Sequence, residues 1–226
     1  MVIKAENIAK RYFRKTGRAN NFFAVKPVSL DIRSGGTAVL MGRSGIGKTT
    51  LLNMLSGLLS PTEGRVLIDD RDLYSLDDKA LSLLRSEKIG VVPQGRSAVD
   101  TLTVFENILL PAALYGRAQP EKEAQMWMER LNIADLRDVR PAELSGGELR
   151  RMAIVRALAH NPEVLFADEP TGDLDDENTH LVLSAFQEYA HEKNKAVFIV
   201  THESDALGYA DLVYRMEDGN LTVERQ

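Results

Sequence analysis

Cysteine is absent from the 226-residue sequence, which excludes disulfides, a thiol nucleophile and a Cys-ligated metal site. Long hydrophobic runs are absent too. The longest apolar stretch, residues 108–115, has a proline in its middle, whereas a bilayer-spanning helix needs about 20 residues. The N-terminus is polar by its fourth residue and lacks the apolar region of a signal peptide. We therefore expect a soluble chain made in the cytoplasm, which could still sit on a membrane through a partner.

The sequence also has no surplus of basic charge. Lys and Arg number 28 against 33 Asp and Glu, for a net charge of -5. This balance argues against broad binding to nucleic acid, so we expect no nucleic-acid partner. The remaining composition, 44% hydrophobic and 27% charged, is ordinary for a globular protein and excludes collagen-like and disordered chains. The length favours one domain, with room for a smaller appended lobe.

Strand-like and helical patterns alternate in the first and last parts of the chain, which predicts a mainly parallel sheet wrapped by helices. Pro27 suits an edge strand or a bend, and Asp218-Gly219 is a hairpin turn signal. A basic stretch, residues 11–21, indicates a hairpin loop. The expected strands are 2–8, 22–32, 37–41, 65–69, 89–92, 164–167, 196–200, 212–216 and 221–224, and the expected helices are 49–59, 79–85, 148–160 and 179–190.

Strand-like runs disappear between about residues 95 and 145. Pro111 and Pro120 punctuate helical pieces there. A stripe at helical spacing predicts a core face; its members are Ala124, Trp127, Met128 and Leu131. This segment indicates a helical subdomain inserted into an α/β chain.

A glycine-rich loop follows the expected strand 37–41 and opens a helix. Residues 42–49 read GRSGIGKT and fit the pattern G-x-x-x-x-G-K-[ST]. Phosphate needs closely approaching backbone N–H groups, which glycines leave uncovered, and the helix N-terminus adds partial positive charge. Lys48 would reach the β- and γ-phosphates, and Thr49 would offer its hydroxyl to Mg²⁺. The loop therefore predicts a phosphate-binding site.

Two acids, Asp168 and Glu169, follow the apolar strand 164–167. The carboxyl end of a strand is the edge at which α/β sheets bind ligands. One acid can order a Mg²⁺ shell and the other can take a proton from water; we assign Asp168 to the metal and Glu169 to the base. Alone, such a pair also fits the solvated start of a loop. The glycine-rich loop is what favours the catalytic interpretation.

Residues 144–148, LSGGE, precede the expected helix 148–160. Ser145 as N-cap and Glu148 three residues later form a capping box, which accounts for both side chains. It leaves Gly146 and Gly147 unexplained, because glycine weakens a helix start unless something must approach the backbone. A second phosphate-facing helix N-terminus is the functional interpretation.

With these three motifs, the chain closely resembles the nucleotide-binding subunit of an ABC (ATP-binding cassette) transporter over essentially its whole length. LSGGE matches the family signature, and the other family motifs follow in the expected order. Gln94 in IGVVPQ matches the Q-loop, and His202 in FIVTHE matches the switch histidine. The D-loop corresponds to TGDLD, with Gly172, Asp173, Leu174 and Asp175 at the dimer contact.

The resemblance implies ATP and Mg²⁺ as ligands and a set of residues for each. Tyr12 occupies the place of the aromatic that stacks on adenine, although Phe13, Phe22 and Phe23 are nearby competitors. Mg²⁺ would be held by Thr49, Gln94 and Asp168, and catalysis would rest on Glu169, His202, Lys48 and Gln94. The nucleotide would contact Gly42, Arg43, Ser44, Gly45, Ile46, Gly47, Lys48, Thr49 and Thr50, and, from a second chain, Ser145, Gly146, Gly147 and Glu148.

The implied fold is an α/β P-loop NTPase with a RecA-like, mainly parallel core, an antiparallel β-subdomain and an inserted α-helical subdomain. Residues 1–226 would be one ABC ATPase domain, with 1–94 and 163–226 as the α/β core and about 95–162 as the helical part. ATP binding would close a nucleotide-sandwich dimer, as a homodimer or with a second cassette. Mg-dependent hydrolysis of ATP to ADP and phosphate would open it, driving a separate membrane permease from the inner face of the cell membrane.

Within the family, the likeness is closest to the lipoprotein-releasing, macrolide-efflux and cell-division-associated ATPases, which favours export or mechanotransmission. Some positions depart from the usual pattern: Arg43 replaces a proline, Ile46 a small residue, and Gly95 a common second glutamine, while the hairpin at residues 13–23 is unusually basic. Two alternatives stay open at this point. One is a non-transport ABC ATPase, and the other is a regulatory ATPase that acts through a membrane partner.

Overall fold

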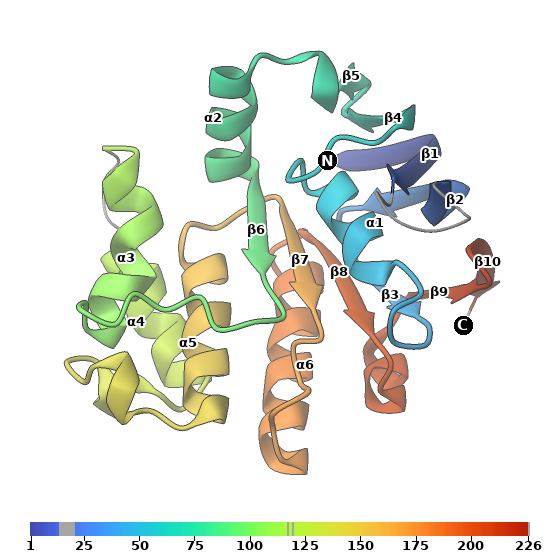
Figure 1. Cartoon of the computed structure of the whole chain (residues 1–226). Helices are drawn as coiled ribbons and strands as arrows, with labels where there is room; N and C mark the ends of the chain where they lie inside the picture. Colours follow the sequence, from blue (N-terminus) through green and yellow to red (C-terminus); the bar gives the residue numbers. More distant parts are fainter. Residues whose placement is uncertain (14–20, 117, 119, 226) are drawn as a thin grey trace.

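The computed structural model describes residues 1–13, 21–116, 118 and 120–225. Its strands form two sheets, one of six strands and one of four (Figure 1). The strands are β1 (Val2–Phe13), β2 (Asn21–Arg33), β3 (Gly36–Met41), β4 (Glu63–Ile68), β5 (Arg71–Asp72), β6 (Ile89–Val92), β7 (Val164–Asp168), β8 (Ala196–Thr201), β9 (Leu212–Glu217) and β10 (Asn220–Arg225). The helices are α1 (Lys48–Leu55), α2 (Asp78–Lys88), α3 (Val104–Leu114), α4 (Glu121–Arg130), α5 (Gly146–Ala159) and α6 (Asp176–His191), with 3-10 turns at Leu73–Ser75, Ala134–Leu136, Pro141–Glu143 and Ser204–Tyr209.

The six-stranded sheet has the order β10-β9-β3-β8-β7-β6, and only its edge strand β10 is antiparallel to its neighbour. Its central strands β3, β7 and β8 are almost wholly buried, as expected for parallel strands covered on both faces. Because these strands run parallel, their carboxyl ends meet at one edge. The glycine-rich loop leaves β3 at that edge. Asp168 is the last residue of β7 there, and Glu169 follows it.

The four-stranded sheet is antiparallel, in the order β2-β1-β4-β5, and β2 lies at its edge. Pro27 therefore sits on an edge strand, as predicted, where a missing N–H donor is tolerated. Helix α1 lies between the two sheets (Figure 1). Its Leu51 and Leu52 share one apolar cluster with Ile3 of β1 and Phe198 of β8. This packing fixes the N-terminus of α1 against both sheets.

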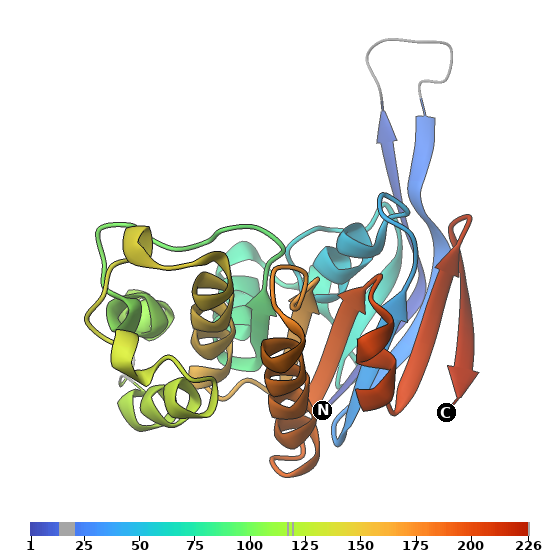
Figure 2. The same cartoon turned by 90° about the horizontal axis from the view of Figure 1, so that it is seen from below.

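Helices α3, α4 and α5 gather beyond the β6 edge of the large sheet (Figures 1 and 2). The predicted apolar stripe is buried there. Its members, Ala124, Trp127 and Met128 of α4 and the following Leu131, belong to an apolar cluster distinct from the one around α1. Trp127 packs edge-to-face on Tyr189 of α6 with ring centroids 5.8 Å apart. The part of the chain described between 95 and 145 holds no strand. The subdomain boundaries themselves stay a prediction.

The predicted break at Pro111 is wrong, because Pro111 lies inside α3. A proline removes one backbone donor from a helix. Here the buried apolar side chains of that helix, including Ile108 and Leu109, outweigh the loss. Smaller differences concern element ends: the first helix stops at Leu55 rather than 59, and β1 continues to Phe13. The middle of the basic hairpin, residues 14–20, lies outside the described residues.

None of the helices in the described ranges combines the length and the apolarity that a bilayer crossing requires.

Candidate active site

The loop between β3 and α1, residues 42–49, borders a hollow of ≈ 550 Å³, here called the loop hollow. Gly47 has a φ of 107°, and a Cβ at that position would lie 2.0 Å from the carbonyl oxygen of Ala24. Only glycine fits this conformation and this contact. The lining residues are Phe22, Phe23, Ala24, Lys26, Ser44, Gly45, Ile46, Gly47, Lys48, Thr49, Thr50, Gln94, Glu169, Asp218 and Gly219.

Gly42 and Arg43 lie on the other side of the same loop. They line a neighbouring hollow of ≈ 420 Å³ together with Ile46, His202 and Arg215. Ile46 borders both hollows. The loop is therefore accessible from two sides.

Lys48 is 6% exposed and holds its charge inside the loop. Its Nζ donates to the carbonyl oxygens of Gly42 at 2.8 Å and Arg43 at 3.1 Å. The same ammonium lies 3.6 Å from Oε1 of Glu169. The structure thus joins the cation of the glycine-rich loop to the predicted base.

Asp168 is buried at the end of β7. Its Oδ1 has no hydrogen-bond partner among the described residues. Burial raises the pKa of Asp168, and a hydrogen bond with the Thr49 hydroxyl and the charge of Lys48 act against this rise. An unpartnered carboxylate oxygen beside a hydroxyl suits Mg²⁺, which commonly takes one or two protein ligands and completes its shell with phosphates and water. The described part of the chain contains no group of three or more His, Asp or Glu side chains that could hold a metal ion by itself.

Glu169 is held by contacts from the end of β8. Its Oε2 accepts hydrogen bonds from Oγ1 of Thr201 at 3.0 Å and from the backbone N–H of His202 at 3.3 Å, and lies 3.0 Å from Nδ1 of His202. Burial raises the pKa of Glu169, but the hydrogen bonds of His202 and Thr201, with the charge of Lys48, bring it below its usual value. Glu169 is therefore an ionised, oriented carboxylate at neutral pH.

The backbone of Glu169 has a φ of 47°, a left-handed conformation that residues other than glycine seldom adopt. Such strain persists only where the surroundings hold it, and it gathers at functional sites. His202 keeps the rest of its ring accessible, with its side chain 59% exposed. Glu169 lines the loop hollow, and His202 lines the neighbouring hollow on the other side of the loop.

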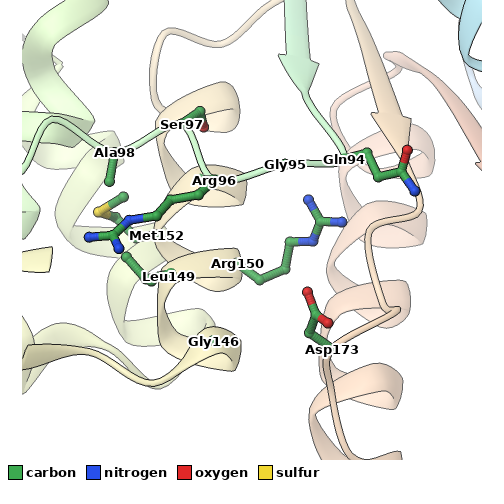
Figure 3. Close-up of a pocket in the computed structure, with 11 residues that line it drawn as sticks. Gln94, Gly95, Arg96, Ser97, Ala98, Gly146, Leu149, Arg150, Met152 and Asp173 are labelled. Atoms are coloured by element: carbon green, nitrogen blue, oxygen red, sulfur yellow. The ribbon is translucent and has the colours of Figure 1, made fainter. Parts of the chain in front are cut away.

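Gln94 follows β6 and borders two hollows. One is the loop hollow, and the other is a smaller one of ≈ 110 Å³ between the segment 94–98 and helix α5. Figure 3 shows the Gln94 side chain at the end of this segment, with Asp173 across the smaller hollow. The structure therefore places the predicted Q-loop glutamine between the glycine-rich loop and α5.

The capping box at α5 is formed as predicted. Oγ of Ser145 accepts from the backbone N–H of Glu148 at 3.3 Å, and Oε2 of Glu148 accepts from the backbone N–H and the hydroxyl of Ser145, both at 2.7 Å. A Cβ at Gly146 would meet nothing within 4 Å. None of residues 145–148 lines the loop hollow. One chain by itself does not bring the LSGGE segment to the glycine-rich loop.

The segment 172–175 connects Glu169 to α6. The backbone N–H of Gly172 donates to the carbonyl oxygen of Glu169 at 3.4 Å, and that of Leu174 donates to Thr171 at 2.9 Å. Asp175 caps α6 by accepting from the backbone N–H of Asn178 at 2.8 Å. Leu174 also lies beside Gly147, whose added Cβ would be 3.2 Å from Leu174 Cδ2. The predicted D-loop thus touches the signature segment within the chain.

The aromatic residues near the loop hollow differ in their distance from it. Phe22 and Phe23 line the hollow, whereas Tyr12 does not. Tyr12 packs on Phe22 with ring centroids 6.0 Å apart, and Phe13 is 74% exposed. Stacking of adenine on Tyr12 stays a prediction, with Phe22 as the adjacent ring.

Two residues that the sequence analysis missed complete the site. Thr201 fixes Glu169, and Arg150 of α5 donates to backbone carbonyls at the ends of β6 and β7. A threonine before a histidine carries no signal of its own. Arg150 could have been found, because an arginine pair that opens a run of apolar residues in a helix requires polar partners.

Comparison with known proteins places this site in a family. The family model described as "ABC transporter" matches residues 25–172. The chain belongs to the ABC transporter family. The ABC transporter ATP-binding protein YtrE of Bacillus subtilis is 37% identical over 209 residues, which cover 92% of this chain and 90% of YtrE. The lipoprotein-releasing system ATP-binding protein LolD of Aquifex aeolicus is 37% identical over 227 residues, covering 99% of this chain and 97% of LolD.

A solved structure extends the likeness to the whole fold. The ATP-binding cassette MJ0796 of Methanocaldococcus jannaschii, a dimer in a post-hydrolysis state bound to ADP and Pi, superposes with a TM-score of 0.91 at 33% identity. The match covers 99% of this chain and 98% of that chain. The predicted family, fold class, ATP-binding role and ATPase activity are confirmed. The roles of single residues stay predictions.

Proposed function

We propose that this cassette binds ATP on the glycine-rich loop, hydrolyses it with Glu169 and uses the cycle to drive a separate membrane permease. The observation that carries the proposal is the constellation around Glu169. An ionised carboxylate, oriented by Thr201 and His202, faces the lysine of a phosphate-binding loop. This arrangement supplies positioned positive charge and a fixed base that can orient water, which phosphoryl transfer to water requires.

Binding rests on the backbone amides of the loop and on Lys48. The amides of residues 45–49 and the N-terminus of α1 offer donors and partial positive charge to the phosphates. Lys48 exchanges its carbonyl partners Gly42 and Arg43 for phosphate oxygens. Ser44, Ile46 and Thr50, which line the loop hollow, shape the cradle.

The donor set beside the loop fits Mg²⁺, as the unpartnered Oδ1 of Asp168 indicates. Asp168 and the Thr49 hydroxyl would hold the ion, with Gln94 at the rim of the same hollow. When bound, Mg²⁺ supplies neutralisation of charge on the β- and γ-phosphates. Asp168 is suited to this position because its environment disfavours an isolated negative charge.

In the hydrolytic step Glu169 orients a water molecule toward the γ-phosphate and accepts its proton. The products are ADP and inorganic phosphate. His202 has two tasks in this step, since its Nδ1 side steadies Glu169 and the exposed remainder of its ring can reach the γ-phosphate. Thr201 keeps the carboxylate from rotating away.

A second cassette completes the site in the proposed cycle. Residues 145–148 lie outside the loop hollow of their own chain. A Cβ at Gly146 would meet nothing within 4 Å, so a ligand of another chain could approach its backbone. A C2 pair of chains would place each signature on the other chain's ATP, with residues 172–175 near the contact. The dimeric state of the MJ0796 structure supports this arrangement. Loss of the γ-phosphate then weakens the cross-chain contacts, and the pair opens.

The permease would hold the cassette at the inner face of the cell membrane and receive the motion through Gln94 and the start of α3, around residues 105–111. Relatives at equal identity carry different descriptions, one lipoprotein-releasing and one a general ABC transporter ATP-binding protein. These descriptions do not agree on a transported substrate. The likeness to LolD favours export or mechanotransmission, which we propose.

Glu169→Gln tests the proposal. The variant keeps the shape of the side chain but cannot take a proton, so it should bind ATP, lose hydrolysis and accumulate as an ATP-bound dimer in gel filtration. Glu163→Gln is the matched control, because Glu163 immediately precedes β7 at its opposite end and pairs with Lys195. It should hydrolyse ATP like the wild type. If Glu169→Gln stays monomeric with ATP, or hydrolyses it at the wild-type rate, the mechanism is refuted.

A further inference from the structure

We propose that Arg150 is a positioning residue for hydrolysis, which ties the signature helix α5 to the backbone of Glu169 and to the segment that carries Gln94. The inference rests on the proposed ATPase function and adds to it a link inside one chain. Arg150 lines neither of the two hollows beside the glycine-rich loop. It acts through the groups that do.

The contacts of Arg150 bring together three segments that are distant in the sequence. Its Nη1 donates to the carbonyl oxygen of Pro93 at 2.5 Å, the residue before Gln94. Its Nη2 donates to the carbonyl oxygens of Asp168, at 3.3 Å, and Glu169. Figure 3 shows the side chain leaving α5 toward the 94–98 segment. One guanidinium therefore connects the ends of β6 and β7 to α5.

The Arg150 guanidinium is buried, so losing its hydrogen bonds would leave a charge without partners inside the protein. Arg150 is 7% exposed and its Nε has no hydrogen-bond partner among the described residues. Burial lowers the pKa of Arg150, and the charges of Asp173, Asp168, Glu169 and Glu203 oppose that shift. Acidic charge surrounds the guanidinium, yet its hydrogen bonds go to backbone carbonyls. A buried cation bonded in this way fixes the peptides that it bonds, because leaving it unpaired would be costly.

The hydrogen bond from Arg150 to the Glu169 carbonyl oxygen bears on the backbone conformation of the proposed catalytic base. Its left-handed φ of 47° is a conformation that the chain adopts only when held. Arg150 holds the carbonyl side of that residue, while Thr201 and His202 hold its carboxylate. Releasing the carbonyl would let the backbone relax and would move the carboxylate from its place. A displacement of about 1 Å in such a group can cost on the order of a hundredfold in rate.

Arg156 provides a comparison on the same helix. Arg156 is less buried than Arg150, and its guanidinium likewise bonds a neighbouring segment. It donates to the carbonyl oxygen of Ser97 at 2.7 Å and to the Ser97 hydroxyl. It makes no contact with Glu169 among the interactions of the described residues. Loss of Arg156 therefore reproduces the structural cost of removing a guanidinium from α5 while leaving the Glu169 peptide in place.

The test compares Arg150→Met, Arg150→Lys and Arg156→Met with the wild type. Two quantities are measured: steady-state ATP hydrolysis, as kcat and KM, and hydrogen–deuterium exchange without nucleotide. We expect Arg150→Met to lower kcat at least about tenfold with KM for ATP changed less than about threefold. Exchange should become faster in peptides covering 164–176 and 89–98. Arg150→Lys, which keeps the charge but not the fork of donors, should fall between Arg150→Met and the wild type.

Arg156→Met should speed exchange near Ser97 but leave that of 164–176 and kcat near the wild-type values. The inference is overturned if Arg150→Met keeps the wild-type kcat and exchange, or if Arg156→Met loses kcat equally. Should Arg150→Met fail to fold, Arg150→Lys decides by the same two measurements. If the wild type hydrolyses no ATP, the proposed function is wrong, and exchange in 164–176 still decides whether Arg150 holds the Glu169 peptide.

Discussion

The substitution Gly146→Ala tests separately the part of the signature segment in the fold and its proposed contact with ATP. Gly146 is the first residue of α5, and a Cβ there would meet nothing within 4 Å. Within one chain the substitution is therefore unopposed. Alanine is favoured over glycine in helices by about 0.5–1 kcal/mol, and a domain of this size gains about 2–4 °C in Tm per kcal/mol. We expect Gly146→Ala to raise Tm by about 1–4 °C.

The same methyl group should impair catalysis. If the phosphates of a second chain's ATP approach the backbone of Gly146, the added carbon occupies their path. We expect ATP hydrolysis to fall at least about tenfold, equivalent to about 1.4 kcal/mol of transition-state stabilisation. The assays are thermal unfolding without nucleotide and ATP hydrolysis over a range of protein concentrations.

Gly208→Ala is the matched control. Gly208 lies in the 3-10 turn Ser204–Tyr209, and a Cβ there also meets nothing within 4 Å. It should leave hydrolysis unchanged. A Gly146→Ala protein that is as active as the wild type would refute the approach of a phosphate to this helix start. A Gly146→Ala protein with a clearly lowered Tm would refute the reading of this position as open.

Two further predictions concern stability. In thermal unfolding without nucleotide, Gly47→Ala should unfold at a lower temperature than Gly45→Ala. Both glycines have a positive φ, which costs alanine about 1–2 kcal/mol. Only at Gly47 would the Cβ also meet the Ala24 carbonyl oxygen, at 2.0 Å. Equal losses would contradict the clash. Glu163→Gln should make stability less sensitive to acid, because the hydrogen bond and charge of Lys195 hold the pKa of Glu163 below its usual value. The stabilisation by ionised Glu163 is complete above the unfolded pKa of about 4.3 and is lost as pH falls through the lower folded pKa. The decrease in Tm below about pH 4.5 should therefore be smaller in the variant than in the wild type. An identical dependence of Tm on pH would contradict this prediction.

The parts of the site that the sequence predicts are those written in short, local patterns. The loop 42–49 has its glycines, lysine and threonine in one short segment, and the structure forms the loop between β3 and α1, where the pattern predicts it. The parallel sheet follows in the same way from apolar runs that alternate with helices. These features depend on neighbours in the chain, so spacing is enough to find them.

The remaining features depend on contacts between distant segments. The ion pair of Lys48 and Glu169 spans more than half of the chain, and no pattern of spacing predicts it. The left-handed backbone of Glu169 is set by its surroundings, since the residue type disfavours it. Pro111 shows the same limit in reverse, because tertiary burial keeps a helix through a residue that local rules would place at its end.

The 3.6 Å contact between Lys48 and Glu169 makes the carboxylate an internal counter-ion of the loop. In the proposed mechanism, an incoming triphosphate would compete with Glu169 for the same ammonium group. Once the phosphates paired with Lys48, Glu169 would lose one of the charges that lower its pKa, and its pKa would rise. In the proposed mechanism, the base of the resting protein would thus be paired with Lys48, and the arrival of the substrate would release it.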